Sequence, residues 1–459
     1  MIRIMKKTIA LLLCGSCLVG LNSCFKQEEN LWNETAQQRV QTTINNYTDI
    51  LTSAQDGWVL EYFANESEQG YAFLMKFNKN MDVTIAAKNS VSSSNAYKEE
   101  LSTYGFVDDQ GPVLSFNTYN SLFTVFAEPG SDGYGHQGDY EFVVDRVSAN
   151  NDTVYLKGKK WGLNARLVKF PMGQSYTAAD GSSAKIEKWE DYFTATEAVK
   201  SRLFNTNVSK MYMSVGDHKY EISVNNGVLS FLPVNASITT LEAVKSYMVS
   251  IDDTFELSSP YTGESGEISV DKFRVSSNGE SIESVGGEYN AVITAPSASE
   301  MIMSQSLQWV VMPESWTGGF KTRYEALKKQ VTDGFASLGY PGVQFRYYLI
   351  RFNSSFGTYA LLQNTGMGDG MHGLNIEATG DNSLKINSTG VSDRNAANDK
   401  KNFPLTVDFL EYLAGKEYTI TPTSVLTPVE IKFVSKDDSN DSFVVKCQSV
   451  GARPSDLIN

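Results

Sequence analysis

Apolar and polar residues alternate along much of this chain, which is the pattern of strands buried on one face. The clearest example has an apolar residue at every second position, namely Tyr71, Phe73, Met75 and Phe77. An Asn-Lys-Asn turn at 78–80 then predicts a hairpin that returns through residues 83–85. Further strands are expected at residues 58–63, 113–116, 122–127, 140–147, 153–156 and 165–170. Short strands separated by Gly, Asn and Asp turns predict antiparallel sandwich or barrel-like sheets.

A few segments instead follow the helical period, with apolar residues every three or four positions. The first is capped by Asn33 and stops at Asp56-Gly57. A second carries the apolar residues Trp189, Tyr192, Phe193, Val199 and Leu203. The apolar face of a third is formed by Phe320, Tyr324, Leu327, Val331 and Phe335. The predicted fold class is therefore mainly β (α+β), with a few amphipathic helices.

A break in periodicity indicates a domain boundary. Residues 171–186 are rich in Gly, Ser and Ala and are interpreted as a linker, after which the order of helix and then strands repeats loosely. We expect an N-terminal helix plus antiparallel β domain at 33–175 and a C-terminal α+β domain at 185–459, in two related-looking halves. Within the second domain, residues 364–402 are expected to form a long loop or several short hairpins.

The first 23 residues have the composition of an export signal. Arg3, Lys6 and Lys7 form a basic region, and the apolar run from Ile9 to Leu21 has the length of a signal-peptide core. The run is too short for a transmembrane helix, which needs about 20 apolar residues. We therefore expect residues 1–23 to be a signal peptide.

This segment ends in Leu21-Asn22-Ser23-Cys24, the pattern that lipoprotein signal peptidase recognises. We expect Cys24 to become the first residue of the mature protein and to carry palmitate or similar acyl chains, with residues 24–32 as a tether. Two or three acyl chains anchor a protein stably, and no other cofactor is expected. Glu28 and Glu29 resemble the surface-export signal of Bacteroidota lipoproteins. The alternatives are an ordinary secretory signal cleaved near Ser23 and a tether that is only solvated.

The charge of the chain argues against nucleic acid as a partner. It carries 53 acidic and 39 basic residues, a formal net charge of −14. Loss of the signal removes three basic residues and no acid, so the charge becomes roughly −17. Binding DNA requires clustered Lys and Arg. The densest basic patch, at residues 157–160, is interpreted as the solvated face of a strand.

The cysteines indicate neither a disulfide framework nor a redox site. Cys14 and Cys17 lie in the export segment, so their spacing carries no functional weight. Cys447 lies in an apolar strand near the end of the chain and is expected to be a buried, inert thiol.

Four short motifs resemble a known family. They are Asp56-Gly-Trp-Val-Leu-Glu-Tyr62, Gly70-Tyr-Ala-Phe73, Gly138-Asp-Tyr-Glu-Phe142 and Leu156-Lys-Gly-Lys-Lys160. Between residues 34 and 170 this pattern resembles the Domain of Unknown Function 4302 family of Bacteroidota lipoproteins. Membership would imply an envelope or surface location, commonly beside outer-membrane transport systems of the starch-utilisation type. The family defines no functional residues, so none is carried over.

The sequence contains no recognisable catalytic motif. The three histidines, His136, His218 and His372, are widely spaced, and no His-Glu-x-x-His pair offers two zinc ligands on one helical face. A Gly-x-Ser-x-Gly nucleophile elbow is also absent. Carboxylate pairs for glycoside hydrolysis are too numerous in an acidic chain to single one out.

Two segments offer weak candidates for metal binding. Met367, Met371 and His372 lie in a Gly-rich stretch and carry ligands that haem iron or copper accepts, although a flexible surface loop is the alternative. The acidic turn at 437–441 offers oxygen ligands for Ca²⁺ but lacks EF-hand spacing, and a solvated turn is the favoured interpretation.

Tryptophans are the candidates for ligand binding through stacking on sugar rings. Trp161 and Trp316 are the weak candidates, and Trp316 is expected on a loop between Pro313 and Gly319. Packing in the core is the alternative for both.

The favoured hypothesis is a lipid-anchored lipoprotein of the outer membrane, exposed at the cell surface. It would act without catalysis, as a binding or accessory protein of a nutrient-uptake system. Its partners would be the membrane, through the anchor, and a glycan or an outer-membrane transporter. The alternative is an exported hydrolase of glycan or peptide, with carboxylates as acid and base.

Overall fold

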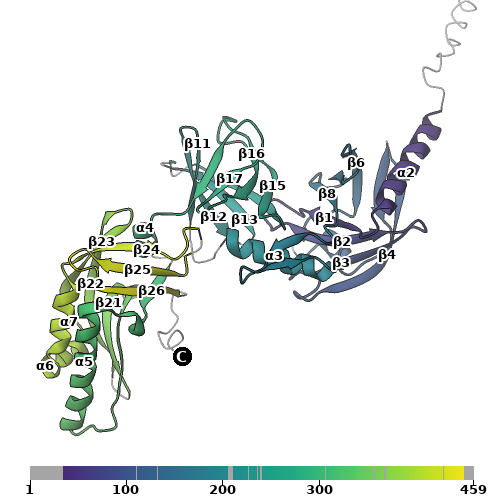
Figure 1. Ribbon diagram of the computed structural model, residues 1–459. Helices are drawn as coiled ribbons and strands as arrows, with labels where there is room; N and C mark the ends of the chain where they lie inside the picture. The colour runs from purple at the N-terminus through teal and green to yellow at the C-terminus, as the bar shows by residue number, and fades with distance from the viewer. Residues whose placement is uncertain are drawn as a thin grey trace, which may run out of the picture.

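The computed structural model describes residues 35–448, apart from 110, 132, 205–209, 226, 235, 238–239, 305–306, 355–356, 366–367 and 427. This part of the chain holds three closed barrels of eight strands each, which follow one another along the sequence (Figure 1). In every barrel each strand pairs with the strand that follows it in the sequence, and the first strand pairs antiparallel with the last. The expected mainly β fold with antiparallel barrel-like sheets is confirmed.

The first barrel is preceded by helix α2 (Ala36–Ser53), which Thr35 caps. Its strands are β1 (Trp58–Tyr62), β2 (Tyr71–Phe77), β3 (Asp82–Ala87), β4 (Lys98–Asp108), β5 (Pro112–Phe116), β6 (Glu141–Val147), β7 (Thr153–Gly158) and β8 (Asn164–Lys169). The indole nitrogen of Trp58 donates to the carbonyl of Leu51 over 2.8 Å, which fixes α2 to the barrel. Asn33, the expected cap, lies outside the described residues.

One expected strand of this barrel is wrong. Residues 122–127 contain the 3₁₀ turn η2 (Thr124–Ala127) in place of a strand. Phe123 and Phe126 are three residues apart, so a helical turn brings both rings to the same side. Both are fully buried in the core of the barrel, where they contact Tyr62 and Phe73 edge to face.

The segment expected as a linker contains the small hairpin of β9 (Ser175–Thr177) and β10 (Ser183–Lys185), followed by helix α3 (Trp189–Leu203). The strands of the second barrel are β11 (Met211–Val215), β12 (His218–Asn225), β13 (Val228–Pro233), β14 (Ala243–Ser250), β15 (Thr254–Tyr261), β16 (Val270–Val275), β17 (Ser281–Ser284) and β18 (Ala291–Thr294).

The third barrel carries most of the helices. Its strands are β19 (Gln308–Val311), β20 (Phe345–Ser354), β21 (Gly357–Asn364), β22 (Gly370–Gly380), β23 (Ser383–Ser392), β24 (Glu417–Pro422), β25 (Glu430–Ser435) and β26 (Ser442–Gln448). The helices are α4 (Ala298–Met303), η3 (Pro313–Ser315), α5 (Gly318–Ser337), α6 (Arg394–Asn402) and α7 (Leu405–Leu413). The predicted apolar face of α5 is confirmed, because all five of its residues are buried.

The described residues therefore hold three barrels where two related halves were expected. The segment 185–459 contains both the second and the third barrel. No polar linker marks their junction in the sequence, because α4 lies there and buries Ala298, Met301 and Ile302 in the core of the third barrel. The described part of residues 364–402 forms one hairpin of two long strands, β22 and β23, followed by α6, where a long loop or several short hairpins were expected.

Helix α3 lies at the junction of the first and second barrels (Figure 1). Val59 on β1 and Leu74 on β2 point out of the first barrel, since their sequence neighbours fill its interior. Both pack in a cluster with Tyr192 and Phe193 of α3 and with Ile251. Strand β1 is thus buried on both faces. Among the described residues, no helix is both long and apolar enough to cross a membrane.

Candidate functional site: a cleft between the first two barrels

A polar cleft of about 360 Å³ lies where the first barrel meets the second. Strands β6, β7 and β8 of the first barrel form one wall, and strands β15 and β16 of the second form the other. The cleft lies within the volume that a small ligand needs. Three basic residues, Arg146, Lys157 and Arg166, line it together with three acidic residues, Asp145, Glu256 and Asp271.

Arg166 connects the two walls of the cleft. Its guanidinium donates to the buried carboxylate of Glu61 on β1 and to that of Glu256 on β15 of the second barrel. Burial alone would lower the pKa of Arg166, but these two carboxylates outweigh it and raise the pKa. Burial raises the pKa of Glu61, and the guanidinium opposes that shift. The guanidinium therefore stays charged and holds the barrels together.

Arg146 and Tyr155 form a flat surface on the first-barrel wall. The guanidinium carbon lies 3.7 Å from the centre of the tyrosine ring, a cation–π contact. The nitrogen Nη1 also lies 2.9 Å from a carboxylate oxygen of Asp145. A planar guanidinium stacked on an aromatic ring presents an area on which a second flat or ring-shaped group can rest.

The opposite wall offers polar groups without protein partners. The hydroxyl of Ser258 is buried and makes no hydrogen bond with any residue that the structure describes. Asp271 makes no ion pair within the described part of the chain, whereas Asp145 and Glu256 are paired with arginines. These groups suit an uncharged ligand that brings its own hydroxyl donors and acceptors.

Trp161, a predicted ligand-binding candidate, lies on the turn between β7 and β8 and does not line the cleft. It is 38% exposed, and its backbone N–H donates to Asp139 over 3.1 Å. The ammonium of Lys160 lies 4.8 Å from the centre of its ring. Its indole therefore remains accessible on the first barrel.

Trp316, the other candidate, is only 2% exposed. Its ring lies about 5 Å from those of Phe409 and Phe443 in the core of the third barrel. Trp316 lies on the connection between η3 and α5, as expected, but its ring turns inward and is not exposed. Packing in the core is the role the structure gives it.

The predicted metal candidates do not converge. Met371 and His372 are consecutive residues of β22, so their side chains point to opposite faces. His372 is 2% exposed, and burial together with Lys400 lowers its pKa to about 4. Met367 lies outside the described residues. In the described ranges, no three His, Cys, Asp or Glu side chains are grouped so that they could hold a metal ion.

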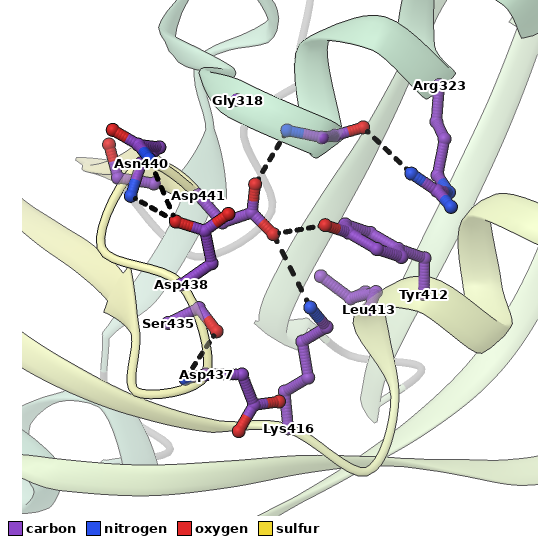
Figure 2. A network of polar contacts seen from close by, with 12 residues as sticks. Gly318, Arg323, Tyr412, Leu413, Lys416, Ser435, Asp437, Asp438, Asn440 and Asp441 are labelled. Atoms are coloured by element: carbon purple, nitrogen blue, oxygen red, sulfur yellow. Dashed lines mark hydrogen bonds and ion pairs between the residues drawn. The ribbon is translucent and has the colours of Figure 1, made fainter.

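The acidic turn at 437–441 is not simply solvated (Figure 2). Asp441 is fully buried and accepts hydrogen bonds from the backbone N–H of Gly319 over 2.6 Å and from the hydroxyl of Tyr412 over 2.5 Å. The ammonium of Lys416 lies 3.4 Å from the same carboxylate. These contacts occupy both carboxylate oxygens of Asp441, and they fix the first turn of α5 to the β25–β26 turn.

Of the cysteines, Cys24 lies outside the described residues. Cys447 lies on β26 as a free thiol. Burial raises its pKa to about 11, so the thiol is protonated at neutral pH.

No motif in the sequence pointed directly to the cleft, but one signal was present. Glu61 stands in the otherwise apolar run from Trp58 to Tyr62, all of which is buried. A carboxylate in such a strand needs a buried cation, and that requirement leads to Arg166 and the junction of the barrels.

Comparison with known proteins places most of the first two barrels in one family. The family described as "Domain of unknown function (DUF4302)" matches residues 28–276. A search of curated proteins found no match.

Solved structures offer only distant similarity. The DNA polymerase III β chain of Streptococcus pneumoniae is 9% identical, over 89% of this chain and 98% of that chain, with a TM-score of 0.12. The β sliding clamp of C. crescentus is 9% identical, over 90% and 97%, with a TM-score of 0.14. Such low TM-scores carry no argument about the fold or function of this chain.

Proposed function

This chain belongs to the DUF4302 family, and we propose that it is a lipid-anchored lipoprotein of the cell envelope that binds an uncharged polar ligand in the cleft between its first two barrels. The ligand class that fits best is a glycan fragment. The protein would act without catalysis, as a binding or accessory component of a nutrient-uptake system at an outer membrane. An outer-membrane transporter would be its partner.

The anchor rests on the sequence. Cys24 follows a basic region, an apolar core of signal-peptide length and the Leu21-Asn22-Ser23 context of a lipoprotein signal. Acyl chains on this residue would hold the barrels at the membrane surface. Surface exposure, and the Bacteroidota origin that the motifs suggest, belong to the same proposal.

The cleft is the observation that carries the binding function. It combines the flat Arg146–Tyr155 surface with an unpartnered hydroxyl at Ser258 and a carboxylate at Asp271. Its lining charges balance, with three of each sign, so it offers no net attraction for a strongly charged ligand. Sugars bring a flat ring face together with hydroxyl groups that donate and accept, which matches these features.

The same cleft gives less support to the alternative, a hydrolase with carboxylates as acid and base. That chemistry needs two carboxylates facing the substrate. Here Asp145 is paired with Arg146, and Glu256 is paired with Arg166. Only Asp271, of the acids that line the cleft, makes no ion pair in the described part of the chain.

Binding of the purified chain to a glycan array tests this proposal. Wild type should bind a defined set of glycans, and Tyr155→Ala should weaken that binding roughly tenfold or more by removing the ring surface. Trp161→Ala is the matched control, since it removes an exposed aromatic ring outside the cleft and should bind as wild type does.

Two outcomes would contradict the proposal. One is the absence of binding to any glycan. The other is binding that Trp161→Ala abolishes and Tyr155→Ala leaves unchanged, which would place the ligand on the β7–β8 turn.

A further inference from the structure

A second pocket, of about 150 Å³, lies at the junction of the same two barrels and shares no residue with the larger cleft. Strand β2 and the segment after β3 form its first-barrel side. Helix α3 and strand β14 form its other side. The pocket is therefore a separate site, with its own set of polar groups.

Asn89 lines this pocket and carries a hydrogen-bond donor that has no partner among the described residues. The side chain is 8% exposed. Its oxygen accepts from the backbone N–H groups of Val91 and Ser92, over 2.9 and 2.8 Å, which fixes the orientation of the amide. A flipped amide would lose both bonds, so the nitrogen Nδ2 is the atom left over, and it is buried without a partner in the described part of the chain. Such a donor is costly unless something else accepts from it.

Lys200, in the last turn of α3, supplies an unneutralised charge. Its ammonium makes no ion pair or hydrogen bond with the described residues. Burial lowers its pKa, against the opposing effect of Glu197. Glu197 itself is engaged by Lys88, whose ammonium lies 3.1 Å from it. The pocket thus contains two cations and one anion, and an additional negative charge would balance it.

One part of the pocket wall is apolar, beside the polar side chains of Gln69, Ser90, Asn95 and Thr196. Phe193 on α3 and Met248 and Val249 on β14 line it, and all three are buried. This apolar part offers room for a short apolar group of a ligand whose charged group lies at the polar side.

We propose that this pocket binds a small monocarboxylate with a short apolar tail. The carboxylate accepts hydrogen bonds from the ammonium of Lys200 and from Nδ2 of Asn89, through the same oxygen or through one oxygen each. The tail packs against Phe193 and Met248. The single negative charge matches the single unbalanced positive charge. This inference stands apart from the proposed glycan binding, since it concerns different residues.

Calorimetric titration of the purified full-length chain with butyrate tests the proposal, with butyramide and inorganic phosphate as comparison ligands at up to about 10 mM. Butyrate should bind saturably. Butyramide has the same size but no charge, and both it and phosphate should bind at least tenfold more weakly than butyrate. A tenfold difference in affinity corresponds to about 1.4 kcal/mol.

Two variants identify the binding groups. Lys200→Met removes the charge, and Asn89→Asp keeps the oxygen that holds the turn while replacing the free donor by an acceptor. Each should weaken butyrate binding roughly tenfold or more. Lys185→Met, an exposed lysine of β10 outside the pocket, is the matched control and should leave binding unchanged. Lys200→Met should fold normally, because the charge that it removes is disfavoured by burial.

The proposal is overturned if butyrate does not bind, if butyramide or phosphate binds as tightly, or if Lys200→Met binds butyrate as wild type does. Tyr155→Ala separates this site from the larger cleft. It should leave butyrate binding intact, and a loss of that binding would also contradict a separate site.

Discussion

The guanidinium of Arg166 on β8 of the first barrel donates to the carboxylate of Glu256 on β15 of the second, and so carries a charge pair across the junction of two barrels. The same guanidinium neutralises Glu61, which is buried behind it on β1. One side chain therefore satisfies a buried charge and connects two structural units.

Arg166→Met should destabilise the protein by about 3–5 kcal/mol, because it leaves the carboxylate of Glu61 buried without a partner. Urea unfolding at pH 7 measures this loss. Lys272→Met is the control, since its ammonium lies 3.9 Å from Glu256 at a more exposed position and should matter by at most about 1 kcal/mol.

The double variant Glu61→Gln/Arg166→Met provides the decisive comparison for this pair. It removes both charges and should recover most of the stability that the single variant loses. An Arg166→Met protein as stable as wild type would show that the pair does not hold the barrels together.

Asp441→Asn should weaken the third barrel by about 3 kcal/mol. The substitution removes the buried charge that pairs with Lys416 and accepts from Gly319 and Tyr412. Thermal unfolding followed by tryptophan fluorescence reports on this, because Trp316 lies in the same core. The exposed neighbour Asp438, changed to Asn, should shift stability by no more than about 0.5 kcal/mol. Equal effects of the two substitutions would rule out a special role for Asp441.

The lowered pKa of His372 predicts that the folded protein loses stability in acid. Its pKa is about 4 in the folded protein and 6.5 ordinarily, so the unfolded chain takes up a proton first as pH falls. The stability that the neutral imidazole provides is complete above pH 6.5 and declines by on the order of 3 kcal/mol as pH falls to 4. His372→Gln should lack this component, and unfolding free energies measured at pH 4 to 7.5 would show whether the two proteins converge in acid.

The raised pKa of Asp399 predicts the opposite dependence of stability on pH. Burial, with Asp393, raises its pKa from 3.8 to about 7, and one of its carboxylate oxygens is buried without a hydrogen-bond partner among the described residues. The protonated acid is therefore favoured in the fold, and stability is lost as pH rises from 3.8 to about 7. Asp399→Asn should stabilise the protein at pH 8 by about 2 kcal/mol, allowing for partial exposure, and should have no effect near pH 4. If Asp399→Asn and the wild type were equally stable at pH 8, a raised pKa of Asp399 would be excluded.

Periodicity was sufficient to predict elements whose apolar residues recur at a regular spacing. The face of α5 from Phe320 to Phe335 follows from residue spacing alone, and so does the hairpin of β2 and β3. The same local signal could not place the boundary between the second and third barrels. The connecting helix α4 buries its apolar residues in the third barrel, so the amino-acid composition does not change at the point where the second barrel ends and the third begins.

The candidate sites were harder to predict because they depend on which side of an element faces the core. Trp316 and Met371 were singled out by residue type in Gly-rich surroundings, but the ring of Trp316 lies among Phe409 and Phe443, and Met371 lies on a strand. The two inter-barrel pockets bring together residues more than 100 positions apart in the chain, such as Tyr155 with Ser258 and Asn89 with Lys200. No local pattern reveals such pairs.

The lipid anchor is the central claim of the proposed function, and mass spectrometry of the N-terminal peptide from natively produced protein tests it most directly. We predict a peptide that begins at Cys24 and carries the mass of two or three acyl chains, and a Cys24→Ala protein that lacks this mass and leaves the membrane fraction. An N-terminal peptide in which Cys24 is unmodified would contradict the account.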